Sequence, residues 1–314
     1  MRKAIAALGG AVVAVVSFRW LTRRRADIDW RSANPPGQIV DVDGVPLHCI
    51  ERGTGPDAAV LIHGFGGHTY TFRYLIPELA KDHRVVAVDL KGFGYSGRPK
   101  KSDYSLTEQA RLVMRLMDAL SIDRASIVGH SMGGEVAMRM AASWPERVER
   151  VVLAASVSGD RIPTLPVTPL IKPFLWLFAR IFGRRIFRRQ FYDPRKATKE
   201  ALEAYRRPLR IKGTGDAIYQ LLRDGQREKR VDHGRIKQPV LILWASHERI
   251  LPRWVLSRLR KQFPRAEVIT IDRAGHLLLE EQPEASNGAI RRSLTGRADV
   301  PVGELTVDIG QPAS

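Results

Sequence analysis

The pentapeptide Gly129-His130-Ser131-Met132-Gly133 has the residue types and spacing of a nucleophilic serine. It follows a short β-branched run and leads at once into a helical pattern, which predicts a sharp turn from strand to helix with Ser131 at its apex. Glycine is needed two residues before and after, because strand and helix pass so close that a side chain would collide. Since five matching residues also arise by chance, a purely structural turn is the alternative.

A serine hydroxyl needs a general base, and that base needs a carboxylate to hold it in one tautomer. His276 follows a strand predicted over 266–271, and Glu248 follows one predicted over 239–244. We therefore expect Ser131, Glu248 and His276 to form a catalytic triad. Asp160, after the preceding strand, is the alternative acid, and Asp272, four residues before His276, ranks third.

Residues 63–67, His-Gly-Phe-Gly-Gly, follow a buried strand predicted over 58–62. The turn could be a simple connection, but a loop at this place supplies a backbone donor for the oxyanion in acyl-transfer enzymes of this shape. We predict an oxyanion hole made by the N–H groups of Phe65 and Met132. His63 is expected to be structural. The helix after Ser131 also points its positive N-terminal end at the same place.

Alternating strands and helices must position these residues. Such alternation predicts a mostly parallel sheet with helices on both faces. Two further strands meet at Asp43-Gly44, a hairpin signal, and Asp89 is expected to form a structural Asx-type turn. The predicted strands are 39–43, 45–51, 58–62, 84–89, the short run that ends in Gly-x-Ser-x-Gly, 151–155, 239–244 and 266–271, and the predicted helices are 71–81, 106–120, one that follows Ser131 and ends near Trp144, 254–263 and one ending near residue 294.

The chain resembles the α/β-hydrolase superfamily from about residue 39 to 294. The matching segments are residues 63–67, 89–96, 129–134, 244–252 and 274–276. The resemblance implies an α/β-hydrolase fold, with a mostly parallel sheet of the eight-stranded type, helices on both faces and a helical cap insertion. It also implies an esterase- or lipase-like activity, and the serine excludes the family's aspartate-based dehalogenases and epoxide hydrolases. Two positions depart from the usual pattern, since Glu248 replaces an aspartate and Ala245 a glycine.

Breaks in the pattern predict the domain organisation. We expect a membrane anchor or signal-anchor at 1–25, a linker at 26–38, a core at 39–156 and 236–294, a basic helical cap at 157–235, and a loose tail at 295–314. Four prolines at the start of the cap interrupt the alternation of strands and helices.

The N-terminal segment has an uncharged run from Ala4 to Phe18, with Arg2 and Lys3 before it and four arginines soon after. The run is shorter than the roughly 20 residues that span a bilayer, although a snorkelling Arg19 would extend it. No cleavage site precedes a mature-looking sequence, so we expect an uncleaved single anchor rather than a cleaved signal. The larger positive cluster on its C-terminal side slightly favours a cytoplasmic catalytic domain.

Positive charge is concentrated in two regions. Of the formal net charge of +18, sixteen charges lie in residues 1–31 and 157–235. Such an excess suggests an anionic surface as partner. Residues 174–189 mix aromatic residues with arginines, which fits an interfacial helix or a lid helix packed on the enzyme. Anionic lipids are the expected partner and nucleic acid is not, because phenylalanine and leucine lie between the arginines and no recognition motif occurs.

These features predict a membrane-associated serine hydrolase that cleaves carboxylic esters of lipophilic small molecules. Trp176, Phe178 and Leu277 are expected to line the substrate pocket. The same triad could cleave a thioester, amide or carbon–carbon bond, and a noncatalytic membrane scaffold that retains the fold is an alternative of another class. The sequence contains no metal motif, phosphate loop or dinucleotide fingerprint, so no cofactor is expected. The lone Cys49 excludes an internal disulfide.

Overall fold

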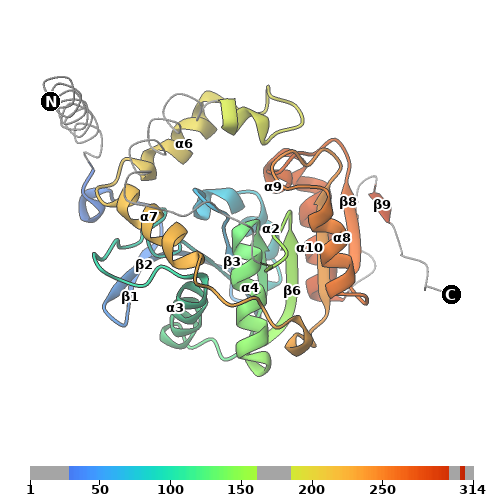
Figure 1. Ribbon diagram of the computed structural model, residues 1–314, viewed down its shortest axis with the longest axis horizontal. Helices are drawn as coiled ribbons and strands as arrows, with labels where there is room; N and C mark the ends of the chain where they lie inside the picture. Colours follow the sequence, from blue (N-terminus) through green and yellow to red (C-terminus); the bar gives the residue numbers. More distant parts are fainter. Residues whose placement is uncertain (1–27, 161–184, 297–304, 308–314) are drawn as a thin grey trace, which may run out of the picture.

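A computed structural model describes residues 28–160, 185–296 and 305–307 of the chain (Figure 1). The predicted anchor at 1–25 and the predicted pocket residues Trp176 and Phe178 lie outside these described residues. Within the described residues, none of the helices has the length and apolar character needed to cross a membrane.

The described strands form one sheet with the order β1-β2-β4-β3-β5-β6-β7-β8-β9. The six strands from β4 to β8 in this order are parallel, while β1, β2 and β9 pair antiparallel. The expected mostly parallel sheet is confirmed, and β9 adds a short strand within the region predicted to be a loose tail. The strands are β1 Gln38–Val42, β2 Val45–Arg52, β3 Asp57–Ile62, β4 His83–Val88, β5 Ala125–His130, β6 Val148–Ala154, β7 Val240–Ala245, β8 Glu267–Ile271 and β9 Leu305–Val307.

Helices cover both faces of the sheet. The helix predicted over 71–81 is a 3-10 turn followed by the short α2, and the last predicted helix is two helices, because Pro283 disfavours helical backbone at Gln282 before it. The helices are α2 Leu75–Leu79, α3 Leu106–Ala119, α4 Met132–Ser143, α6 Lys199–Leu209, α7 Thr214–Gly225, α8 Trp254–Gln262, α9 Leu278–Glu281 and α10 Pro283–Thr295, and the 3-10 turn η2 is Thr69–Phe72.

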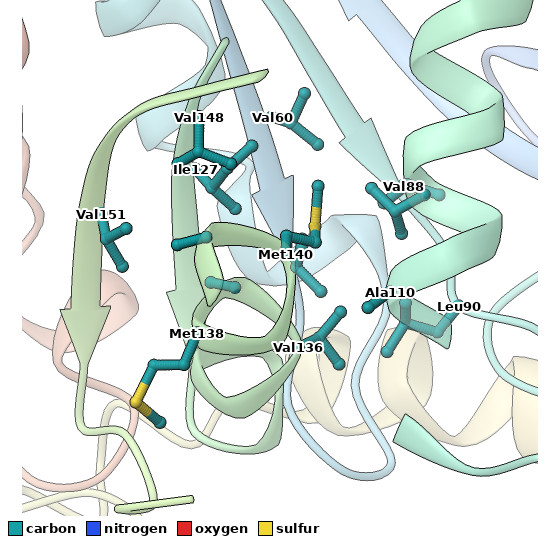
Figure 2. Packing of buried hydrophobic residues seen from close by; sticks show 14 of the residues in the cluster. Val60, Val88, Leu90, Ala110, Ile127, Val136, Met138, Met140, Val148 and Val151 are labelled. Carbon is teal, nitrogen blue, oxygen red and sulfur yellow. The ribbon is translucent and has the colours of Figure 1, made fainter. Parts of the chain in front are cut away.

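Alternation along the central strands builds the two apolar layers. In β3, Val60 and Ile62 pack in the cluster that contains α3 and α4, whereas Ala59 and Leu61 pack in the cluster that contains α2 and α10. Figure 2 shows the first cluster, with Val136 of α4 among the strand side chains. Because both faces of the sheet are buried, its central strands are continuous apolar runs, and this explains why they were recognisable in the sequence.

The cap helices α6 and α7 attach to the core in different ways. Ala217 and Leu221 of α7 belong to the same apolar cluster as α3 and α4. Helix α6 lies over the loops that follow the parallel strands, where the Tyr205 hydroxyl donates to the Glu280 carboxylate and accepts from Thr71 (2.9 Å). The cap therefore covers the carboxyl ends of the strands, the edge at which Ser131 lies.

Asp89, at the end of β4, has a wider structural role than the expected local turn. Its fully buried carboxylate accepts the N–H of Tyr95 (2.8 Å), and it also accepts the N–H of Thr69 (2.6 Å) and the Nδ1–H of His48 (2.7 Å). The other ring nitrogen of His48 is 2.7 Å from the carbonyl oxygen of Pro36. Since both partners can only accept, both ring nitrogens donate and His48 is an imidazolium.

The two pKa shifts of this pair agree with an ion pair. Burial alone would lower the pKa of His48 and raise that of Asp89, but their mutual hydrogen bond and charges outweigh burial. The pKa of His48 is therefore raised and that of Asp89 is lowered.

We predict that the stability supplied by His48 depends on pH. Because its folded-state pKa is raised, the contribution is fully present below the unfolded pKa of about 6.5 and is lost as pH rises through the folded value. Thermal unfolding of the protein and of its His48→Gln variant should show the largest difference in Tm near pH 5 to 6 and a smaller one at pH 9. A difference that stays constant over this range would contradict the imidazolium assignment.

Candidate active site

Ser131 lies at the apex of the turn between β5 and α4, in a backbone conformation that few residues other than glycine adopt. Its φ is 52° and its ψ is −116°. The conformation costs about 1–3 kcal/mol and persists only where the surroundings hold it. Here the Ser131 N–H donates to the carbonyl of Ala154 (2.9 Å), which fixes the turn to the neighbouring strand β6.

Close backbone contacts explain the glycines around Ser131. A Cβ on Gly129 would lie 2.4 Å from the carbonyl oxygen of Gly133, and a Cβ on Gly133 would lie 2.1 Å from that of Ile62. The predicted collisions are confirmed: Gly129 lets the strand approach the helix, and Gly133 lets the helix approach β3.

The structure brings Ser131, His276 and Glu248 into one chain of hydrogen bonds. The Nε2 of His276 is 3.0 Å from the Ser131 hydroxyl, and its Nδ1 is 2.8 Å from a carboxylate oxygen of Glu248. An ionised carboxylate only accepts, so Nδ1 carries the proton and Nε2 accepts from the serine. This is the tautomer that a general base requires.

Glu248 is held at both oxygens. While Oε2 accepts from His276, Oε1 accepts the N–H groups of Ile250 (2.6 Å) and Leu251 (3.0 Å). Burial would raise the pKa of Glu248, but the His276 hydrogen bond, the charge of the imidazole when protonated and the two N–H groups outweigh it, so the pKa is lowered. The backbone contacts hold the longer glutamate where the family usually has an aspartate.

Neither alternative acid is a partner of His276. Asp160 forms an ion pair with Arg258 (2.7 Å) and accepts from Gln262 (3.0 Å), both on α8. The side chain of Asp272 is 53% exposed and pairs with Arg273. The structure therefore assigns the carboxylate contact to Glu248.

Both predicted oxyanion donors lie on segments that contact Ser131. Met132 is the first residue of α4, so its N–H has no acceptor within the helix. A Cβ added to Gly64 would lie 2.9 Å from the Cβ of Ser131, and Phe65 is the next residue of that turn. The turn is closed by a bond from the Gly67 N–H to the Gly64 carbonyl (3.0 Å).

Two histidines near the site are neutral and buried. His63 has the structural role expected, with Nδ1 donating to the Gly64 carbonyl (2.7 Å) and Nε2 accepting the N–H of Leu90 (3.0 Å), and burial lowers its pKa. His130 was not identified from the sequence. Its Nε2 is 2.9 Å from the carbonyl oxygen of His276, and burial, helped by repulsion from His276, lowers its pKa to about 3.

Leu277, predicted to line the pocket, is buried in a packed cluster with Phe187, Phe191 and Tyr205 beneath the cap. It therefore supports the cap in the described structure. A surface hollow of about 740 Å³ lies elsewhere, between residues 101–107 and 220–229, and none of the triad residues lines it. Within the described residues, no three His, Cys, Asp or Glu side chains are placed to hold a metal ion.

Comparisons with known proteins agree with this geometry. The sequence profile described as alpha/beta hydrolase fold matches residues 58–283. The chain is 33% identical to the dihydrolipoyllysine-residue acetyltransferase component of the acetoin cleaving system of Pseudomonas putida, over 82% of this chain and 69% of that protein. It is 29% identical to the uncharacterized hydrolase YugF of Bacillus subtilis, over 77% of this chain and 92% of that protein.

Among solved structures, the meta-cleavage product hydrolase of Pseudomonas fluorescens is similar, with a TM-score of 0.71 and 26% identity over 83% of this chain and 98% of that one. The profile match covers most of the chain, and it includes the serine turn and both partner loops. The chain belongs to the α/β-hydrolase family and is a hydrolase.

Proposed function

We propose that the protein is a membrane-associated serine hydrolase that cleaves carboxylic esters of lipophilic substrates. The observation that carries the proposal is the hydrogen-bonded chain from Ser131 through His276 to Glu248 at the carboxyl edge of the sheet. Such a chain delivers an activated hydroxyl to a carbonyl carbon.

The reaction follows from these positions. His276 takes the proton of Ser131 as the hydroxyl oxygen bonds to the ester carbon, and the N–H groups of Phe65 and Met132 stabilise the oxyanion. His276 then protonates the departing alcohol, which leaves an acyl-enzyme. Water attacks the acyl carbon while His276 takes its proton, and the acid is released as the proton returns to Ser131.

A lipophilic ester is favoured by the surroundings of the serine. Phe65, whose N–H is a predicted oxyanion donor, has a large apolar side chain that is 52% exposed. The cap sequence adds aromatic and basic residues over 174–189. An acyl chain would cover such apolar groups.

Membrane association is supported by where the N-terminal segment joins the fold. Ile28 pairs with Ile211, and its carbonyl accepts the N–H of Lys212 (3.0 Å), directly after α6. This end of the cap exposes Arg206, Arg207, Arg210 and Lys212, together with Leu209, which is 44% exposed. A bilayer that held residues 1–25 would therefore lie beside a basic surface with an apolar tip.

Hydrolysis of a carbon–carbon bond is the second candidate, because the chain is similar to a meta-cleavage product hydrolase. The ordered triad favours either enzyme over a noncatalytic scaffold. The reaction products distinguish the two activities. Ester hydrolysis releases an alcohol and an acid, whereas carbon–carbon bond hydrolysis releases two fragments that a carbon–carbon bond had joined.

We predict that hydrolysis of p-nitrophenyl acyl esters depends on Ser131. Ser131→Ala should reduce kcat/KM on the order of 10⁴-fold or more and abolish labelling by a fluorophosphonate probe, because no nucleophile remains. Ser293→Ala, on the distant α10, is the matched control and should keep both. If the protein cleaves no ester from short to long acyl chains and Ser131 does not react with the probe, the proposal is wrong.

Glu248→Gln should lower kcat on the order of 10³ to 10⁴-fold while the protein stays folded, because a glutamine amide that donates to Nδ1 imposes the wrong tautomer. Asp160→Asn is the control, since Asp160 pairs with Arg258 on the surface. Steady-state kinetics on the same ester measures both. If Asp160→Asn lowers kcat more than Glu248→Gln does, Asp160 is the triad acid instead.

Vesicle flotation of the full-length protein tests the membrane proposal. We expect binding that is stronger to anionic than to zwitterionic vesicles and that weakens with salt, at roughly 1 kcal/mol for each basic residue at the surface. Arg206→Gln/Lys212→Gln should therefore lower affinity for anionic vesicles about tenfold or more, whereas Lys261→Gln/Arg265→Gln, remote from the cap, should not. Retention on DNA with no flotation would overturn the proposal.

A further inference from the structure

Glu281, the last residue of α9, is a buried carboxylate with no part in the triad. Its Oε2 accepts the N–H of Gly275 (2.8 Å) and of Tyr192 (2.8 Å), and its Oε1 accepts the N–H of Asp193 (2.7 Å). Gly275 directly precedes His276, whereas Tyr192 and Asp193 belong to residues 190–193, which we call the cap stem. One side chain therefore joins the histidine loop to the cap.

The cap stem also contacts the histidine loop directly. A Cβ on Gly275 would lie 2.3 Å from the carbonyl oxygen of Gln190, so only glycine fits there. The same Gln190 carbonyl accepts the N–H of Leu277 (3.3 Å). Gly275 and Leu277, on either side of His276, thus both contact the cap stem.

The loop of the triad acid meets the same segment. The rings of Tyr192 and His247 have their centroids 4.3 Å apart, and His247 directly precedes Glu248. The N–H of His247 donates to the carbonyl of Ala274 (3.0 Å), which ties the acid loop to the histidine loop. The cap stem therefore braces the loops that carry His276 and Glu248.

A carboxylate is a costly way to fill this buried volume. Burying it is unfavourable unless its lone pairs are satisfied, and an apolar side chain would avoid that cost. The carboxylate instead fixes three backbone N–H groups in place through charge-assisted hydrogen bonds. Two of these groups lie on the cap stem and one lies beside His276.

We propose that Glu281 is a positioning residue, which holds the His276 imidazole in register with Ser131 by fixing Gly275 to the docked cap stem. This inference rests on the proposed serine hydrolase function. It makes the geometry of the triad depend on the attachment of the cap, and it assigns to Glu281 an effect on the chemical step rather than on substrate binding.

Glu281→Gln tests the inference, because the amide keeps the shape but points N–H groups at one of the backbone donors. We expect kcat and the rate of fluorophosphonate labelling of Ser131 to fall about 10- to 100-fold, as a displacement of the base by a fraction of an ångström would cause. KM for the p-nitrophenyl ester should change less than threefold.

Glu280→Gln is the matched control. Glu280 is the neighbouring buried glutamate and also joins core to cap, but its partners are Arg73 (2.6 Å) and Tyr205 rather than the histidine loop. We expect both variants to lose Tm, and only Glu281→Gln to slow labelling of Ser131. Equal labelling rates in the two variants would overturn the positioning role.

The labelling assay separates this inference from the proposed function. If the unaltered protein is not labelled at Ser131, the serine hydrolase proposal fails and the inference fails with it. If it is labelled and Glu281→Gln is labelled as fast, only the inference fails. Should Glu281→Gln not fold, Tyr192→Ala is the substitute, because Tyr192 is half-buried and its removal abolishes the ring contact with His247. We then expect Ser131 to be labelled about threefold or more slowly than in the unaltered protein. An unchanged labelling rate in Tyr192→Ala would then contradict the proposal that the cap stem positions the loops of His276 and Glu248.

Discussion

The active site depends on the close approach of β5, α4 and β3 around Ser131. Gly129 and Gly133 permit backbone contacts that no side chain would allow, and Ser131 lies between them at a φ of 52°. The unfavourable backbone conformation places the hydroxyl outside the sheet and leaves the first N–H groups of α4 without helical acceptors. Catalytic geometry is therefore a consequence of packing in the core.

Three buried carboxylates organise the loops at this edge of the sheet, and each uses backbone N–H groups. Asp89 binds those of Thr69 and Tyr95, Glu248 binds those of Ile250 and Leu251, and Glu281 binds three from two separate segments. Loops have no regular ladder to satisfy their N–H groups, and a buried carboxylate provides several strong acceptors at one point. Rigid loops allow the triad to be preorganised.

Hydrogen bonds connect the cap to the segment that follows His276. Tyr205 of α6 reaches Glu280, and the cap stem reaches Glu281, the next residue. The N-terminal segment enters beside the same cap at Ile28.

The sequence by itself determined the α/β fold, Ser131 and His276, because strand periodicity, the glycine spacing and the order along the chain are local patterns. Only the tertiary structure decided between Glu248 and Asp160, since both follow strands of the same sheet and only packing shows which carboxylate reaches Nδ1. The same holds for the His130, Glu281 and His48–Asp89 contacts. Their partners lie far away in sequence or in loops without a periodic pattern, and burial of a polar group becomes visible only when its surroundings are known.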